Sequence, residues 1–268
     1  MPERSSVPHR RRPDGDVAIG AWLSLGSPDV AEVLGHAGFD WVLIDQQHAA
    51  VGPAQMLELV RAVDSSGAAP IVRIPANTPE HYVYALDAGA HGVMVPMVED
   101  RGAAEAAVHA FSYPPDGARS IGGYRAHLAF GMSRSEYLAK PPARLILQLE
   151  HRRAIENIDE IAAVPGIDVL FVGPQDLSAS YGLPPSLDMS QPLMRAAIDT
   201  MTRAGQAHGV GLGALCADVD SAYEYIDAGF TMLALGIDAS MLTAAAGARV
   251  RPFRKPGSAR RTALPRRT

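Results

Sequence analysis

Residues 145–178 decide the fold: they read LILQLE (145–150), then a charged helical stretch, then DVLFVGPQDLS (168–178). Both apolar runs have the length of a buried strand, and a carboxylate follows each, Glu150 or Asp176. Strands buried on both faces of a parallel sheet have such near-continuous apolar sequences. Two parallel neighbours end at the same edge of the sheet, so we expect the two carboxylates to lie close enough to share one cation.

The same alternation of apolar run and helical segment extends along the chain. We expect strands at 17–25, 41–45, 70–74, 92–98, 145–149, 168–172, 210–215 and 232–235. Helices are expected between them, with 152–163 after the fifth strand and a Gly/Pro/Ser-rich loop after the sixth; a Pro- and Gly-rich stretch, 112–143, interrupts the pattern. Eight strand–helix units predict a (β/α)8 TIM barrel over residues 17–248. A doubly wound open sheet is the alternative, but the first turn lacks its Gly-rich fingerprint.

Composition excludes several classes of protein. The chain has 268 residues, of which 47% are hydrophobic, and no apolar run approaches the roughly 18 residues of a membrane span. Residues 1–16 are polar and predict a flexible arm rather than a secretory signal. Cys216 is the only cysteine, which excludes an internal disulfide framework and a multi-cysteine zinc site. We therefore expect a cytoplasmic protein that does not contact membranes.

The charge is uneven. The net charge is −5, yet segment 249–268 holds eight basic residues and no acidic one, so the first 248 residues carry −13. A basic tail can bind nucleic acid or another acidic partner. Its prolines and Gly257 favour a disordered, solvated terminus instead, so we expect no nucleic-acid partner.

Polar residues stand at the ends of the expected strands, where TIM barrels carry their reactive groups. They are Asp45, Gln47, His48, Arg73, Gln148, Glu150, Asp176 and Asp238. Glu150 and Asp176 are hard oxygen ligands, and with water or substrate they would suit Mg²⁺, Mn²⁺ or Co²⁺. The alternative is that Glu150 caps the helix starting at His151 and that Asp176 caps a turn.

Arg73 and His48 extend this hypothesis. A buried arginine needs an anion, which is either Asp45 in a structural pair or a carboxylate or oxyanion of a substrate. His48 could act as a general base, although an isolated loop histidine is usually inert. Metal, arginine and base together suggest enolate chemistry on a 2-oxo acid. Lys140 and Lys255 are the only lysines and neither lies on a strand, which argues against a Schiff-base aldolase.

These residues form an ordered set of motifs that resembles the HpcH/HpaI aldolase family, the class II, metal-dependent pyruvate aldolases. The motifs are AGFDWVLID-x-x-H (37–48), VRIP (72–75), LDAGAHGVMVPMV (86–98), YPP-x-G-x-R (113–119), QLE (148–150) and VGPQDLS (172–178). The resemblance covers about residues 17–247. It implies a TIM barrel of the phosphoenolpyruvate/pyruvate superfamily that reversibly cleaves a 4-hydroxy-2-oxo acid to pyruvate, or a close analogue, and an aldehyde.

The resemblance also implies roles for single residues. Glu150 and Asp176 would ligate the metal, His48 would be the base and Arg73 would stabilise the enolate. The oxo acid would lie against four further residues: Gln148, Gly173, Pro174 and the backbone of Gln175. Asp87 matches an acid that raises the basicity of the histidine. Because it ends a helix on the far side of its own barrel, we expect it to act across a subunit contact in a homo-oligomer, a hexamer or trimer of dimers with exchanged C-terminal helices.

Two positions depart from the family pattern, and other functions stay open. Gln47 replaces a frequent acidic residue, which should lower the histidine pKa, and Gly123 replaces a frequent serine. Asp45, Gln47, Gly123 and Tyr124 are therefore candidates for positioning or specificity. The alternatives are a carbon–carbon lyase of acyl-CoA substrates, of the citrate-lyase β type, and a non-enzymatic barrel whose basic tail binds an acidic partner.

Overall fold

The computed structural model describes residues 17–253, and the expected N-terminal arm (1–16) and residues 254–268 of the expected tail lie outside the described residues. Eight parallel strands pair in sequence order, and β8 closes onto β1. The strands are β1 (Ala18–Leu23), β2 (Trp41–Asp45), β3 (Ala69–Arg73), β4 (Gly92–Val95), β5 (Arg144–Leu149), β6 (Val169–Val172), β7 (Gly211–Leu215) and β8 (Met232–Ile237). The predicted (β/α)8 barrel is confirmed.

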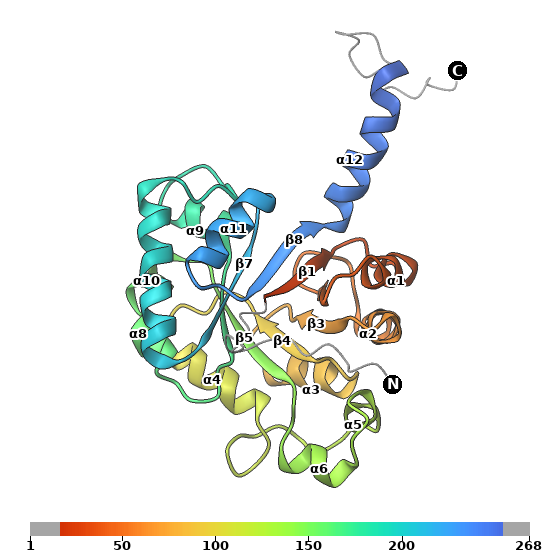
Figure 1. Ribbon diagram of the computed structural model, residues 1–268. Coiled ribbons are helices and arrows are strands. Elements are labelled where there is room, and N and C mark those ends of the chain that lie inside the picture. Colours follow the sequence, from red (N-terminus) through yellow and green to blue (C-terminus); the bar gives the residue numbers. More distant parts are fainter. Residues whose placement is uncertain (1–16, 254–268) are drawn as a thin grey trace, which may run out of the picture.

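Helices surround the barrel (Figure 1). They are α1 (Pro28–His36), α2 (Pro53–Ser66), α3 (Pro79–Asp87), α4 (Arg101–Phe111), α5 (Arg125–Ala129), α6 (Arg134–Ala139), α7 (Arg152–Glu156), α8 (Ile158–Ala162), α9 (Pro174–Ser180), α10 (Pro192–His208), α11 (Val219–Asp227) and α12 (Asp238–Val250), followed by a 3₁₀ turn (Arg251–Phe253). Several begin with proline, which suits the first helical position because its missing N–H has no intrahelical partner there. No helix within residues 17–253 is long and apolar enough to cross a membrane.

Two expectations for these helices were wrong. The segment after β6, expected as a loop, forms the short helix α9, which Pro174 starts immediately after the strand. The helix expected over 152–163 is broken at Asn157, whose side-chain amide donates a hydrogen bond to the carbonyl of Glu99 at 3.0 Å. A contact with a distant loop thus divides α7 from α8, and no local pattern encodes it.

The last helix, α12, leaves the barrel and projects away from it (Figure 1). Asp238 is its only buried residue. Leu242 on the helix and Phe253 in the turn after it are exposed, Phe253 by 87%. The basic residues Arg249 and Arg251 therefore stand at the far end of this projection rather than on the barrel surface.

Large side chains fill the barrel interior. Trp22, Trp41, Ile71, Met94 and Phe171 belong to the buried cluster inside the strands, while a second, larger cluster lies between the strands and the helices. Gly20 makes the interior packing feasible, because a Cβ at that position would lie 2.1 Å from the ring of Trp41. The barrel is a packed core, so the site can open only at its mouth.

We predict that Gly20→Ala destabilises the protein by about 1–3 kcal/mol, because the added methyl group overpacks the core against Trp41. Urea unfolding followed by circular dichroism measures the change. Gly102→Ala is the matched control: the position is exposed in α4 and its Cβ would meet only ordinary contacts. Equal midpoints for Gly20→Ala and the native chain would contradict this account of the core.

Candidate active site

A cavity of about 310 Å³ opens at the carboxyl ends of the strands. Trp22 and Phe171 of the barrel core contribute to its lining, as does Ser24. Eight residues predicted for the site also line it: Asp45, His48, Arg73, Gln148, Gly173, Pro174, Gln175 and Asp176. Residues from four different strand ends therefore meet in one pocket, as the barrel rule predicts.

A buried ion pair joins the ends of β2 and β3. Arg73 donates from Nε to Asp45 Oδ1 at 2.9 Å and from Nη2 to Asp45 Oδ2 at 2.7 Å. Two parallel charge-assisted bonds fix both side chains more firmly than one could. Burial works against the ionised form of Asp45, but the hydrogen bond and charge of Arg73 hold the pKa of Asp45 below its usual value. The structural pair that the sequence left open is therefore present.

Arg73 also reaches further into the cavity. Its Nη1 donates to the side-chain oxygen of Gln148 at 3.4 Å, and its guanidinium lies 4.8 Å from the centre of the Trp22 ring. Pairing with Asp45 uses Nε and Nη2, so part of Nη1 is left to interact with a bound molecule. Arg73 can thus be both a structural group and a binding group.

Glu150 has a different environment. It is buried; its Oε1 accepts the backbone N–H of Met97 at 2.9 Å, and its Oε2 is buried with no hydrogen-bond partner among the described residues. Burial is the main cause that raises the pKa of Glu150 to about 7, and the nearby charge of Asp176 contributes. A buried carboxylate oxygen without a partner has lost its hydration and gained no hydrogen bond, which destabilises the folded state. A bound cation would offset this desolvation penalty.

The neighbourhood of Glu150 fits a divalent cation. Asp176 lies in the first turn of α9, and its charge acts on Glu150. A Cβ at Gly173 would lie 2.6 Å from Glu150 Oε2 and 2.9 Å from Gln148 Nε2, so the backbone of Gly173 packs directly against these polar atoms and only glycine fits there. No group of three or more His, Cys, Asp or Glu that could hold a metal occurs within residues 17–253. Water or substrate would have to complete the coordination of two hard carboxylates.

Glu150 does not cap the helix that follows it, which was the alternative interpretation of this residue. The N-cap of α7 is His151, whose Nδ1 accepts the backbone N–H of Arg153 at 3.2 Å. Glu150 instead turns toward Met97, at the end of β4. The acid at the end of β5 is therefore held by a neighbouring strand segment rather than by its own helix.

His48 is exposed at the cavity, on the loop after β2. Asp45 Oδ1 holds this loop by accepting the backbone N–H groups of Gln47 at 2.9 Å and His48 at 3.3 Å. The side-chain oxygen of Gln47 is buried with no partner among the described residues. The ion pair therefore positions the backbone of the loop that carries the imidazole.

Glu150 and Gln47 do not themselves line the cavity but are next to residues that do, and three further predicted residues lie outside it. Asp87 ends α3 and its Oδ1 accepts a bond from Arg119 at 2.9 Å. Gly123 has φ +65, and a Cβ there would lie 2.6 Å from the Asp87 carboxyl carbon, so a serine would clash. Tyr124 is exposed and its hydroxyl accepts a bond from Arg61. None of the three lines the cavity of its own chain.

Sequence reasoning missed two contributors. Ser24 lines the cavity and is fixed by Asp238, whose Oδ1 accepts its backbone N–H at 2.9 Å and its hydroxyl at 2.6 Å. A polar residue directly after the first strand was the available signal. Met97 acts through its backbone and has φ +56, a strained conformation for a residue with a side chain. Nothing in the local sequence indicates that contribution.

Comparison with known proteins agrees with this geometry. The family model of the HpcH/HpaI aldolase/citrate lyase family matches residues 18–245. The chain is 36% identical to 2-dehydro-3,6-dideoxy-6-sulfogluconate aldolase of Pseudomonas putida, over 84% of this chain and 88% of the relative. It is 36% identical to hydroxypyruvate/pyruvate aldolase of Paraburkholderia phytofirmans, over 85% and 90%.

A solved structure shows the same similarity. A family member from Burkholderia cenocepacia superposes with a TM-score of 0.81 at 37% identity, covering 90% of this chain and 95% of the other. The chain therefore belongs to the HpcH/HpaI aldolase/citrate lyase family, as its motifs indicated. It is a carbon–carbon lyase of the aldolase type.

The raised pKa of Glu150 predicts a specific pH dependence of stability in metal-free protein. The pKa of Glu150 is about 7 in the folded state, whereas the ordinary value of a glutamate is 4.5. The added stability is therefore complete below about pH 4.5 and is lost as pH rises through 7. We expect the native chain to lose up to about 3 kcal/mol more than Glu150→Gln between about pH 4 and pH 8. Urea unfolding in the presence of EDTA measures both; parallel pH profiles would contradict the assignment.

Proposed function

We propose that the protein is a divalent-metal-dependent aldolase that reversibly cleaves a 4-hydroxy-2-oxo acid to pyruvate, or a close 2-oxo acid, and an aldehyde. The observation that carries this proposal is the buried, unpaired Oε2 of Glu150 beside Asp176, Gln148 and Arg73. The aldolases among its relatives support the reaction class.

Glu150 and Asp176 would hold Mg²⁺, Mn²⁺ or Co²⁺. When bound, such a cation would supply Lewis-acid polarisation of the 2-oxo group. Their oxygen chemistry and the orphaned Oε2 support this assignment. Gly173 packs directly against Glu150, and the backbone from Gly173 through Pro174 to Gln175 borders the cavity.

The substrate carboxylate and 2-oxo group would lie between Gln148, Arg73 and the Gly173–Gln175 backbone. In the cleavage direction a base takes the proton of the 4-hydroxyl as the C3–C4 bond breaks. The electron pair of that bond forms the enolate of the 2-oxo acid, and a proton then adds to C3. His48 would be the base, and Arg73 would stabilise the negative charge on the enolate oxygen.

We predict that the protein exchanges the methyl protons of pyruvate with solvent deuterium, because this step needs the enolate site and no aldehyde. EDTA should lower the exchange rate at least about 100-fold, and Mg²⁺, Mn²⁺ or Co²⁺ should restore it. Proton NMR in D₂O measures the rate.

Variants refine this test. Glu150→Gln and Asp176→Asn should each weaken Mn²⁺ binding by at least about tenfold in titration calorimetry, whereas Glu160→Gln, an exposed acid on α8, should not. Undiminished exchange in metal-free protein would overturn the metal proposal. Exchange of acetyl-CoA rather than pyruvate would favour the acyl-CoA lyase alternative.

The protein would work as a homo-oligomer in which α12 packs on another copy. This helix projects from its barrel (Figure 1). Leu242 and Val250 on the helix and Phe253 in the turn after it are exposed. Exposed apolar side chains on a projecting helix suit a subunit contact. The family resemblance favours a hexamer built as a trimer of dimers.

Asp87 would assist His48 of a neighbouring copy. Within one chain it pairs with Arg119 and lies outside the cavity that holds His48. Its side chain is about one-fifth exposed, so one carboxylate edge is left for a neighbour. Gly123 lies directly against it and so leaves that edge uncovered.

We predict that His48→Gln and Asp87→Asn, each inactive alone, recover activity when co-expressed. A mixed oligomer then contains sites with both native groups, about a quarter of the total for random assembly. The pyruvate exchange assay measures the recovery. His48→Gln co-expressed with Arg73→Lys is the control: both residues line one cavity, so no site regains both. If the first pair does not recover activity, Asp87 either acts on His48 of its own chain or does not assist His48 at all.

A further inference from the structure

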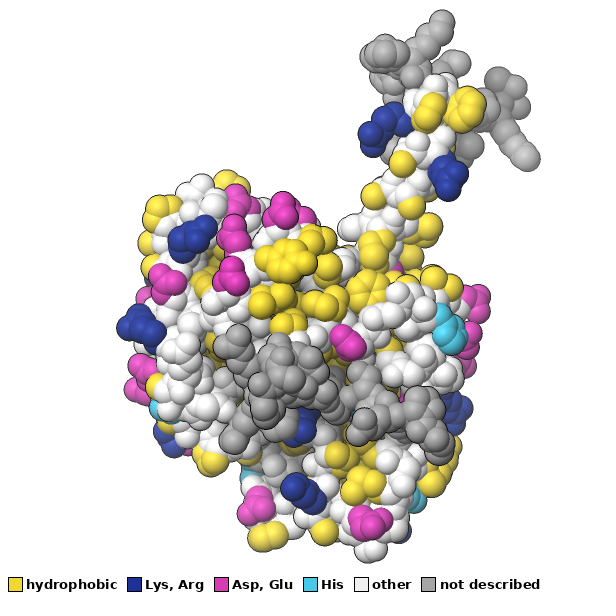
Figure 2. All heavy atoms as spheres, in the orientation of Figure 1, with side chains coloured by type: hydrophobic (Ala, Val, Ile, Leu, Met, Phe, Trp, Pro, Cys, Tyr) yellow, Lys and Arg dark blue, Asp and Glu magenta, His cyan; other side chains and the backbone are white. Residues whose placement is uncertain are grey.

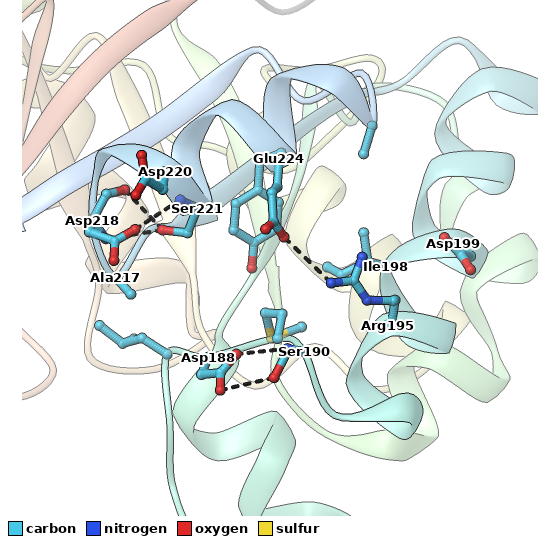
Figure 3. A pocket seen from close by; sticks show the side chains of 14 residues that line it. Asp188, Ser190, Arg195, Ile198, Asp199, Ala217, Asp218, Asp220, Ser221 and Glu224 are labelled. Carbon is cyan, nitrogen blue, oxygen red and sulfur yellow. Dashed lines mark hydrogen bonds and ion pairs between the residues drawn. The ribbon is translucent and has the colours of Figure 1, made fainter.

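A second cavity, of about 300 Å³, lies between α10, α11 and the loop before α10 (Figure 3), and it shares no lining residue with the cavity at the barrel mouth. The proposed aldolase reaction does not use it. Its apolar side includes Leu187, Met189 and Ile198. The remaining lining is strongly polar, and we call the whole the acidic groove.

The charge of the groove is one-sided. Five carboxylates line it against a single guanidinium, that of Arg195. The five are Asp188, Asp199, Asp218, Asp220 and Glu224. Acidic side chains also gather on the surface over α10 and α11, at the upper left of Figure 2. The groove therefore attracts cations.

The single guanidinium does not neutralise it. Arg195 Nη2 lies 3.6 Å from Glu224 Oε2, and the two side chains are 59% and 70% exposed. Such a loose surface pair contributes little and can exchange for another cation. Asp188 and Asp218 stay ionised, because the backbone N–H groups of Ser190 and Ser221 hold the pKa of each below its usual value.

Tyr225 is an independent sign of a ligand. It lines the groove, is 4% exposed, and its hydroxyl is buried without a hydrogen-bond partner among the described residues. Its ring is fixed by Phe230, with the ring centres 5.0 Å apart. A buried hydroxyl without a partner carries a desolvation penalty that a donor entering the groove would remove.

An arginine side chain would suit the apolar side of the groove, its carboxylates and the buried hydroxyl of Tyr225. Its aliphatic stem can cover the apolar side, its planar head offers several N–H donors to carboxylates and to a tyrosine oxygen, and it stacks on aromatic rings. A metal ion would leave the apolar part of the groove unused.

We propose that the acidic groove binds the basic segment 254–268 of a neighbouring copy of this chain. That segment carries three basic pairs, at 254–255, 260–261 and 266–267, and no acid. Its charge complements a body that carries −13. The helix α12 leads the chain away from its own barrel, and fifteen further residues can span up to about 50 Å.

Zero-length crosslinking with a carbodiimide tests this directly, because the chain has only two lysines, Lys140 and Lys255. On the full chain we expect Lys255 to be joined to Asp220 or Glu224. An equal mixture of separately prepared ¹⁵N-labelled and unlabelled chains, unfolded and refolded together, should give crosslinked peptides of mixed label. Arg261→Lys keeps the charge and adds a second reactive amine at the middle basic pair, 260–261. We expect this amine to be crosslinked to Asp220 or Glu224 as well.

Binding of a labelled peptide with the sequence of residues 254–268 supplies the energetic test. The receptor is the full chain with its own six basic residues in that segment changed to Gln, and fluorescence anisotropy measures binding. Asp220→Asn/Glu224→Gln should weaken binding at least about tenfold, and Tyr225→Phe about threefold or more. Glu32→Gln/Glu160→Gln, which removes two exposed acids elsewhere, should change it less than about twofold.

Some results would overturn the proposal. Crosslinks from Lys255 only to carboxylates outside the groove would do so, as would equal peptide binding by groove and control variants. Crosslinked peptides without mixed label would overturn the assignment to a neighbouring copy. Binding of the peptide that vanishes only with the groove variants supports it.

Discussion

The candidate site depends on the buried ion pair between Asp45 and Arg73. The two residues are register partners at the ends of β2 and β3, and each carboxylate oxygen accepts one guanidinium N–H. The same carboxylate holds the backbone of the His48 loop and the Trp22 indole. Because breaking a buried pair leaves an uncompensated charge, this one contact fixes two strand ends, the imidazole loop and the direction of Arg73.

Glu150 differs from Asp45 in its pKa, which burial raises, whereas the pKa of Asp45 is lowered by its pairing with Arg73. Its carboxylate has no basic partner as close as that of Asp45; one oxygen is held by the strained backbone at Met97 and the other is orphaned. The result is a carboxylate that favours its protonated form until a positive charge arrives. The ends of β2 and β5 thus supply a satisfied acid and an unsatisfied one, and only the second suits cation binding.

The proposed contacts between copies would account for three features that a single chain leaves unexplained. Asp87 is tied to Arg119 outside the cavity, α12 projects with exposed apolar residues, and the acidic groove shares no lining residue with the cavity at the barrel mouth. Each would be satisfied by a second copy. An acidic body and a basic segment in one chain favour head-to-tail contacts, and salt should weaken them because screening reduces attraction between exposed charges.

The sequence alone determined the barrel and most of its mouth. Apolar runs of strand length, each followed by a polar residue, are local patterns, and β2 was predicted with the bounds that the structure has. The tertiary structure alone shows that Arg73 binds Asp45 through two hydrogen bonds and that Asp87 occupies the space a side chain at Gly123 would need. It also shows that α9 is helical and that Asp220 and Tyr225 line one groove. The physical reason is that these depend on contacts between segments distant in sequence, which no local periodicity encodes.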